Sequence, residues 1–441
     1  MNQTVSVDRI AAGGVNVEQI QATNVLIKID DIADREVWRH PVWNLSRGLG
    51  RLGVQSLEIH GATDYLESLA EVMRGLPFSQ ATGPWFLELV DQVDTDADLI
   101  VDLTNSQFSK LLSASLAASN QIPCLSVDWG RTSVELNYLG DPLEQVIASV
   151  SPEAANGLPL LPVARIASGM ALQEILISVG QSEQIAATLF YNAADESRVE
   201  PGRIDWPQIA LHNITVEVVG AGGTGVNFLE AFAPLLSGDC TVRVFDSDTV
   251  GSENLSMQIA YHPEDVGEPK ATVMAKKLYK YCSARIQPFV MDYQGRPLEL
   301  PSPSLRVLCP DNFEARLLAN RASLEDGVPL IDLGSSPHAA RVVVYQPGKT
   351  ACLEHHLPGL AEQAAEERQR ASCYRNREPT LPGTNMVCAG IAACEALRVL
   401  QPELFGEPSL GTILYDTRFA DRFGIVDRRP VCNHVVSEER K

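Results

Sequence analysis

The chain has 441 residues, of which 45% are hydrophobic, and this is enough for two or three domains that each bury a core. Its formal net charge of −21 argues against nonspecific binding to nucleic acid or anionic membranes, because both would repel it. The N-terminal stretch has no apolar core of signal-peptide length, and no uninterrupted apolar run approaches the roughly 20 residues of a membrane span, so we expect a cytoplasmic protein.

The first half predicts a strand, a helix and a second strand. The segment NVLIKIDD from Asn24 has a strand pattern, residues 34–53 have the pattern of a helix closed by glycine, and VQSLEIHG follows as a strand. The turn between Ile29 and Val37 contains no glycine. A phosphate would therefore find no backbone cradle in this turn.

Residues 216–248 predict the same succession with a glycine turn. The strand VEVV is followed by Gly220-x-Gly222-Gly223-x-Gly225, an apolar run of helical length, and the strand TVRVF, which ends at Asp246. This is the order of a nucleotide-binding unit, in which glycines let backbone N–H groups approach a polyphosphate at a helix N-terminus. Asp246 lies where a carboxylate can accept hydrogen bonds from ribose. By itself the glycine pattern fits a NAD-binding protein equally well.

The two halves align with each other over long stretches. At one constant displacement, Asn105 falls on Asp311, Lys110 on Arg316 and Pro123 on Pro329. At a larger displacement Gly169 falls on Gly390, and at a slightly larger one TLFYN falls on TILYD. We therefore predict two diverged copies of one fold, residues 1–200 and 201–441, the second of which gained about fifteen residues between Tyr345 and Gly390.

Spaced positions in the second copy resemble the adenylating domain of the E1-like superfamily, which includes ubiquitin-activating enzymes and the bacterial sulfur-carrier activators of the ThiF and MoeB type. The matching positions are Gly220, Gly222, Gly223, Gly225, Asp246, Asp248, Asn254, Leu255, Gln258, Lys270, Asp311 and Asn312. The resemblance implies an α/β fold of two tandem ThiF-like Rossmann-type domains that form a pseudo-dimer. Because the N-terminal copy lacks the glycine loop and has Asn105 where the other has Asp311, we expect it to be inactive.

The resemblance also implies roles for these residues. Adenylation joins a carboxylate to the α-phosphate of ATP and expels pyrophosphate, so the site needs positive charge, a metal ion and positioning. Lys270 would contact the phosphates, and Asp311 would hold Mg²⁺. The alternatives are a solvated lysine at a helix start and, for Asp311, a cap for the helix that begins at Asn312.

Asn254 and Gln258 would hydrogen-bond the phosphates or the sugar. The family pattern has an arginine immediately before that glutamine, but this chain has Met257, which removes a fork-like phosphate donor. An arginine from the other half could replace it, and the candidates are Arg9, Arg35 and Arg39.

Nine cysteines without a C-x-x-C pair do not indicate a disulfide framework. Cys240, Cys309 and Cys388 lie in apolar segments and are expected to be buried. Cys373 stands where E1-like proteins carry the cysteine that takes the activated carboxylate as a thioester. Arg368, Arg370, Arg375 and Arg377 surround it in sequence and would favour the thiolate, although a loop cysteine without a role is the alternative.

Many family members hold a structural zinc ion with two C-x-x-C pairs. Here the corresponding positions carry Cys352, His355, Cys432 and His434, and this Cys2His2 set is chemically acceptable to zinc. Both cysteines lie in polar surroundings in the sequence. A degenerate site that has lost its metal is the alternative.

These observations predict an E1-like enzyme that adenylates the C-terminal glycine of a ubiquitin-like or sulfur-carrier protein with Mg·ATP. The expected partners are that carrier and an E2-like protein, with no nucleic acid and no membrane. The alternatives are a peptide-adenylating enzyme that matures peptide antibiotics, a non-catalytic binding protein, and a NAD-dependent reductase. The last is disfavoured because Lys270 and Asp311 would have no purpose in it.

Overall fold

The computed structural model describes both halves of the chain, the second more continuously than the first. The described residues are 16–29, 41–60, 86–89, 96–104, 107–129, 133–138, 160–180, 188–193, 206–207, 210–280, 282–295, 300–369, 380–409, 411–419 and 421–426.

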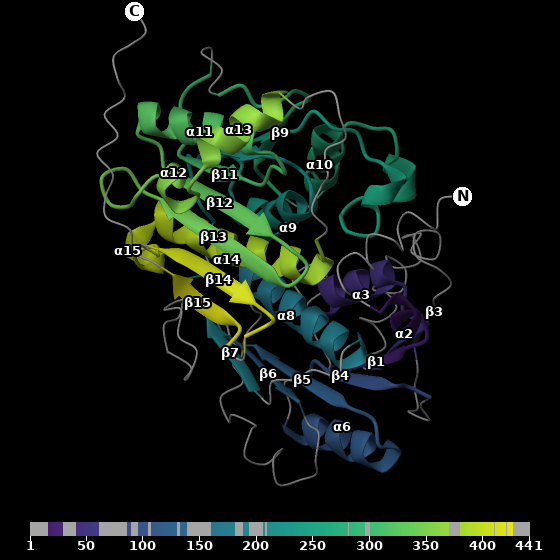
Figure 1. The fold of residues 1–441 in the computed structure, drawn as a ribbon. Coiled ribbons are helices and arrows are strands. Elements are labelled where there is room, and N and C mark those ends of the chain that lie inside the picture. Colours follow the sequence, from purple (N-terminus) through teal and green to yellow (C-terminus); the bar gives the residue numbers. More distant parts are fainter. Residues whose placement is uncertain are drawn as a thin grey trace, which may run out of the picture.

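A mixed β-sheet forms the framework of the first half (Figure 1). Its seven strands have the order β3-β2-β1-β4-β5-β6-β7, and pairing is parallel from β3 to β5 and antiparallel from β5 to β7. The strands are β1 (Asn24–Lys28), β2 (Ser56–His60), β3 (Phe86–Leu89), β4 (Leu99–Asp102), β5 (Cys124–Trp129), β6 (Ser133–Tyr138) and β7 (Thr188–Asn192).

The second half builds an eight-stranded sheet in the order β10-β9-β8-β11-β12-β13-β14-β15. Pairing is parallel from β10 to β12 and antiparallel from β12 to β15. The strands are β8 (Thr215–Val219), β9 (Thr241–Phe245), β10 (Arg285–Phe289), β11 (Leu305–Leu308), β12 (Leu330–Ser335), β13 (Ala339–Tyr345), β14 (Thr412–Asp416) and β15 (Phe423–Val426).

The two sheets share one strand order, with β15 as an additional edge strand in the second. The first residues of β4, β5 and β6 fall on the first residues of β11, β12 and β13 at the displacement that aligns Asn105 with Asp311. The first residue of β7 falls on that of β14 at the displacement that aligns TLFYN with TILYD. The same alignment therefore describes both the sequence and the order of the strands.

The helices follow the same correspondence. The start of α6 aligns with the start of α11 at the Asn105 displacement, and the start of α8 aligns with the start of α14 at the Gly169 displacement. The α-helices are α2 (Val17–Gln21), α3 (Pro41–Leu52), α6 (Gln107–Asn120), α8 (Leu161–Gly180), α9 (Gly223–Phe232), α10 (Lys270–Leu278), α11 (Phe313–Asp326), α12 (Leu353–His356), α13 (Leu360–Gln369), α14 (Pro382–Leu400) and α15 (Pro402–Phe405). Short 3-10 turns are η2 (Ala233–Leu235), η3 (Ser252–Asn254) and η4 (Pro263–Asp265).

Helices α8 and α14 lie against each other between the two sheets (Figure 1). Glycines permit this close approach, because a Cβ atom on Gly169 would lie 2.6 Å from the carbonyl oxygen of Gly383. By length and composition both helices could cross a membrane. However, 83% of the apolar stretch in α8 and 89% of that in α14 are buried inside the protein. Burial of this extent is typical of core helices in a globular protein.

Three apolar clusters stabilise this arrangement. The largest joins the two halves, because it includes buried residues of α3, α8, α9 and α14 and of both sheets. A second lies beneath α11, α12 and α13 on the opposite side of the second sheet, and a third lies beneath α6 on the first sheet (Figure 1). The two halves therefore share one apolar core.

Candidate functional site

A cavity of about 870 Å³ opens at the carboxyl ends of strands β8, β9 and β11. Ligands of open α/β sheets bind at this edge. Of the eleven predicted nucleotide-binding residues, those that line the cavity are Gly220, Gly222, Gly223, Asp246, Asp248, Gln258, Lys270, Asp311 and Asn312. Gly225 and Asn254 are not among the lining residues.

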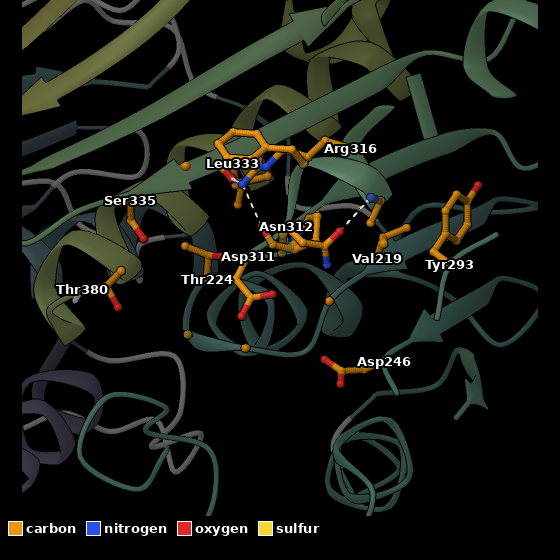
Figure 2. A pocket seen from close by; sticks show the side chains of 18 of the residues that line it. Val219, Thr224, Asp246, Tyr293, Asp311, Asn312, Arg316, Leu333, Ser335 and Thr380 are labelled. Atoms are coloured by element: carbon orange, nitrogen blue, oxygen red, sulfur yellow. Dashed lines mark hydrogen bonds between the residues drawn. The ribbon is translucent and has the colours of Figure 1, made fainter. Parts of the chain in front are cut away.

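The cavity has two chemically different ends (Figure 2). Figure 2 shows Tyr293 at one end, Ser335 and Thr380 at the other, and Asp311 between them. At the polar end the Ser335 hydroxyl donates to Asn385 Oδ1 over 2.7 Å, and Asn385 in turn donates to Thr380 over 3.2 Å. At the other end Phe245 stacks on Phe289 and meets the edge of Tyr293.

The glycines of the turn after β8 divide into two groups. Gly220 has φ +95°, and a Cβ atom there would lie 2.7 Å from the carbonyl oxygen of Cys309. A Cβ atom on Gly225 would lie 2.1 Å from the carbonyl oxygen of Gly220, so Gly225 is needed for the turn itself. At Gly222 the nearest atom to such a Cβ is Gln258 Nε2 at 3.9 Å, and this glycine leaves space open to a ligand.

Asp246 holds the glycine turn in place. Its carboxylate accepts hydrogen bonds from the backbone N–H of Ala221 over 2.6 Å and of Asp248 over 2.8 Å. Burial raises the pKa of the Asp246 carboxyl, although the Lys270 ammonium and these two donors act in the opposite direction. The sequence suggested a ribose contact, and the turn-holding contact to Ala221 was not foreseen.

Lys270 is buried, with 2% of its surface exposed, at the first position of α10. Its Nζ atom lies 2.9 Å from Asp248 Oδ2, and it lines the cavity. The alternative of a solvated lysine is therefore wrong. The buried ammonium is oriented by a carboxylate that is itself part of the cavity wall.

The segment after β9 supplies one polar lining residue and one structural residue. Asn254 is buried and its Oδ1 accepts a hydrogen bond from the N–H of Gly251 over 2.9 Å, so it shapes the segment from behind the cavity. Gln258 lines the cavity, and its Oε1 atom is buried without a hydrogen-bond partner among the described residues. Met257 also lines the cavity.

Asp311 and Asn312 divide their roles at the start of α11. Asn312 is the N-cap, and its Oδ1 accepts a hydrogen bond from the N–H of Ala315 over 2.7 Å. The alternative that Asp311 caps this helix is therefore wrong. Asp311 is exposed to the cavity, and its carboxylate is the hard oxygen ligand that Mg²⁺ prefers.

The residues present fit a magnesium ion that is shared with a nucleotide. Mg²⁺ is held in nucleotide sites by one or two carboxylates together with substrate phosphates and water. Asp311 provides such a carboxylate, and it is exposed on the wall of the same cavity that the open N-terminus of α9 lines through Gly222. Within the described residues no group of three or more His, Cys, Asp and Glu side chains could hold a metal by itself.

Helices α9 and α11 both begin at the cavity wall, and of these two N-termini only that of α9 is open. Helix α9 begins after Gly222, which offers no side-chain cap. The start of α11 is filled by Glu367 from α13, whose carboxylate accepts hydrogen bonds from the N–H groups of Phe313 over 2.7 Å and Glu314 over 3.2 Å. An anionic ligand is therefore directed to α9.

Two arginines that the sequence analysis did not propose as site residues also line the cavity wall. Arg316 pairs with Asp332 and donates to the carbonyl oxygens of Pro310 and Leu333 over 2.8 and 2.9 Å. Arg341 binds the other oxygen of Asp332 over 2.8 Å. Burial, assisted by the charge of Arg341, lowers the pKa of Arg316 to about 10. Both arginines line the cavity, but the carboxylate of Asp332, with which both pair, partly neutralises their positive charge.

Several predicted residues lie outside the described part of the chain. They are Arg9, Arg35, Arg39, Asn105, Arg370, Cys373, Arg375, Arg377, Cys432 and His434. The roles of Cys373 and of these arginines therefore stay predictions. Arg368 is described, and its Nε lies 3.5 Å from Glu314 Oε1.

The described half of the predicted zinc site shows a different environment from the one expected. Cys352 was expected in polar surroundings, but it is fully buried in the apolar cluster beneath α12. Its Sγ atom lies 3.4 Å from His355 Nδ1. These two residues alone do not support a zinc ion, and zinc stays a prediction.

Comparison with known proteins shows the family of this chain. A model of the ThiF family matches residues 197–423, about half of the chain, and the chain therefore belongs to the ThiF family within the E1-like superfamily. It is 33% identical over 254 residues to a sulfur carrier protein adenylyltransferase of Thermus thermophilus, a match that covers 51% of this chain and 84% of that protein.

A eukaryotic relative and a solved structure are matched over a smaller share of their own length. The chain is 33% identical over 150 residues to the NEDD8-activating enzyme E1 catalytic subunit of Schizosaccharomyces pombe, which covers 32% of this chain and 33% of that protein. The crystal structure of E. coli MccB with ATP matches 51% of this chain and 67% of its own, with a TM-score of 0.41 and 22% identity. The relatives matched in sequence are adenylyltransferases and E1 activating enzymes, and they indicate the general kind of reaction.

Proposed function

We propose that the second half binds Mg·ATP in this cavity and adenylates the C-terminal carboxylate of a ubiquitin-like or sulfur-carrier protein. The observation that carries the proposal is the uncapped N-terminus of α9, which faces the same cavity as Lys270 and Asp311. A polyphosphate needs backbone N–H groups, a cation and an oxygen ligand for its metal. These three kinds of group lie around one space.

The two ends of the cavity suggest how the substrates lie. The base of the nucleotide suits the aromatic end at Tyr293, and Asp246, at the end of β9, would accept hydrogen bonds from ribose. This leaves the polar end, at Ser335 and Thr380, for the incoming protein tail. A tail that ends in glycine has no side chain to exclude at this end.

The reaction then follows from charge and position. A carboxylate oxygen of the tail attacks the α-phosphorus atom, the bond from that phosphorus to the bridging oxygen breaks, and pyrophosphate leaves with the bonding electrons. Magnesium, when bound, neutralises phosphate charge, and Asp311 would hold it. The Lys270 ammonium and the N–H groups at the start of α9 stabilise the charge that moves toward the leaving group.

Capture on Cys373 is the second step of the proposal. The thiolate would attack the carbonyl carbon of the acyl adenylate, the bond from that carbon to the phosphate oxygen would break, and AMP would leave. An alanine at this position should abolish a reductant-sensitive adduct and spare the exchange of pyrophosphate into ATP. An adduct that survives in Cys373→Ala would exclude this cysteine.

The first half is proposed to be an inactive copy of the same fold. Its strand β1 ends at Lys28, which is buried at the position where β8 ends with Val219. No glycine follows Lys28 before Gly48, and the counterpart of Asp311 is Asn105. The chain would then contain one nucleotide site, in the second half.

The test is the exchange of labelled pyrophosphate into ATP in the presence of candidate carrier proteins that end in glycine. The proposal predicts exchange that depends on Mg²⁺ and on the terminal glycine of the carrier. Exchange that proceeds with short peptides and not with any folded carrier would contradict the substrate class. A chain that neither binds ATP nor exchanges pyrophosphate would contradict the proposal as a whole.

A further inference from the structure

The glycine turn is connected to the first half by a relay through Tyr261. The Tyr261 hydroxyl donates to the carbonyl oxygen of Ala221 over 2.7 Å. The backbone carbonyl of Tyr261 in turn accepts a hydrogen bond from Arg51 of α3 over 2.5 Å. Ala221, Tyr261 and Arg51 are all fully buried. A single chain of contacts therefore runs from a helix of the first half to the turn that would hold phosphate.

A second relay reaches the start of α9 through Asn227. Arg165 of α8 donates to Asn227 Oδ1 over 2.8 Å, and Asn227 Nδ2 donates to the carbonyl oxygen of Gly223 over 2.7 Å. Because the guanidinium group can only donate, it fixes which side of the Asn227 amide faces Gly223. Arg165 and Asn227 are buried as well.

Both relays rest on a buried charge cluster between the halves. The carboxylate of Glu230 on α9 accepts hydrogen bonds from both terminal nitrogens of Arg47, over 3.0 and 3.1 Å. It accepts another from a terminal nitrogen of Arg165 over 2.9 Å. Burial opposes the charged form of Glu230, but the two arginines outweigh it and lower the pKa of Glu230 to about 2. Arg47 of α3 and Arg165 of α8 are therefore held against α9, and Arg51 lies one helical turn beyond Arg47 on α3.

These contacts determine where two N–H groups of the turn point. In a trans peptide the carbonyl and the N–H point in opposite directions. Since the Ala221 carbonyl is tied to Tyr261, which does not line the cavity, the N–H of Gly222 is directed toward the cavity that Gly222 lines. The tie from Asn227 to the Gly223 carbonyl fixes the N–H of Thr224 in the same way.

We infer that Arg51 and Arg165 of the first half are positioning residues for phosphate binding in the second half, acting through Tyr261 and Asn227. The inference rests on the proposed function, because it assigns the anion at α9 to the phosphates of ATP. It gives the first half a role that does not require a nucleotide site of its own. Pre-oriented N–H groups bind a phosphate without the entropic cost of first ordering the turn.

The experiment compares the binding of two ligands that differ only in phosphate. Calorimetry on the full chain gives the affinity for Mg·ATP, and competition gives the affinity for adenosine. We expect Tyr261→Phe, which removes only a hydroxyl, and Arg165→Met each to weaken Mg·ATP binding by about tenfold. Each change would misalign a turn N–H group that donates a hydrogen bond to the charged phosphate. The affinity for adenosine should change by less than about twofold, because adenosine has no phosphate to reach the N-terminus of α9.

A matched control is available in a second buried ion pair between the halves that the described residues contain. Glu174 of α8 lies 3.0 Å from Arg422 of the second half, and both are buried, but neither lines the cavity. We expect Glu174→Gln to lower the unfolding temperature and to leave the affinity for Mg·ATP within about twofold. Thermal unfolding of every variant separates lost folding from lost positioning.

The outcomes are distinct. Tyr261→Phe and Arg165→Met proteins that are folded and bind Mg·ATP as the unmodified chain does would overturn the inference alone. Equal losses for Mg·ATP and adenosine, or an equal loss in Glu174→Gln, would overturn it too, because they indicate general destabilisation. A folded unmodified chain that binds no Mg·ATP would overturn the proposed function itself.

Discussion

The carboxyl edges of the two sheets differ although their strands run in the same order. In the first half, side chains that pair with one another lie at this edge: the buried Lys110 Nζ lies 3.1 Å from the partly buried Asp128 and donates to Ser126 over 2.7 Å. In the second half the corresponding edge opens into the cavity of about 870 Å³. The comparison teaches that strand order places a site, while the side chains at the strand ends decide whether it can hold a ligand.

The residue of the second half that aligns with Lys110 shows how the charged side chains of the two edges differ. Arg316 occupies its position and pairs with Asp332, which stands where the first half has Ser126. In the first half burial raises the pKa of Asp128, and the Lys110 ammonium only partly opposes this. The first half thus has an ion pair that only partly offsets the cost of burying its carboxylate, and the second half has cations on a cavity wall.

The largest expected effect concerns Asp311. We expect Asp311→Ala to lower pyrophosphate exchange by about a thousandfold, because the hard oxygen ligand for magnesium is removed. Asn105→Ala, the same change at the aligned position of the first half, should leave exchange within about twofold. Rates measured at saturating carrier would contradict the proposed asymmetry if both changes had similar effects.

Two lysines give a second comparison between the halves. Lys270→Ala should lower the rate constant of exchange by about a hundredfold, because a preorganised cation is lost near the phosphates. Lys110→Met should leave exchange nearly unchanged but lower the free energy of unfolding by about 2 kcal/mol, because the partly buried Asp128 loses its cation. Urea unfolding and exchange assays distinguish the two. Loss of exchange in a stable Lys110→Met protein would show that the first edge also acts in the reaction.

The charge cluster between the halves predicts a dependence on pH. The pKa of Glu230 is lowered to about 2 from its ordinary value of 4.5, so the stability that it contributes is present above about pH 4.5 and is lost as pH falls toward 2. That stability amounts to about 3 kcal/mol. The difference in unfolding free energy between the unmodified chain and Glu230→Gln should therefore shrink as pH falls from 5 to 2.5. A difference that stays constant over this range would contradict the buried ion cluster.

The smallest effect is expected at Glu367. Glu367→Gln keeps an oxygen acceptor at the start of α11 but removes a negative charge from the cavity wall. We expect the affinity for Mg·ATP to rise by about two- to threefold, because repulsion of the phosphates decreases. Calorimetry at low and high salt checks this, and the gain should be smaller at high salt. A loss of affinity would indicate that this carboxylate assists binding.

The sequence predicted the parts of the fold and site that depend on local patterns. The strand, glycine turn, helix and strand from Val216 to Asp246 are all observed, and the internal alignment that pairs Asn105 with Asp311 places β4, β5 and β6 relative to β11, β12 and β13. The contacts of Glu367 and Tyr261 were not predicted, because they join residues that are far apart in the chain. No spacing or periodicity marks such a pair before the fold brings it together.

The cap of α11 and the burial of Cys352 were not predicted, because both depend on the folded backbone. The sequence left open whether Asp311 binds magnesium or caps a helix that begins at Asn312, whereas in the structure Asn312 is itself the cap. Burial of Cys352 depends on α12 and α13 packing over the sheet, which polar neighbours in the sequence concealed.

The stoichiometry of Mg·ATP binding to the intact chain tests the central claim most directly. We predict one nucleotide per chain by equilibrium titration, and none in Gly222→Val, since that side chain would occupy the open space at the start of α9. Two nucleotides per chain, or one that persists in a folded Gly222→Val protein, would contradict a single site in the second half.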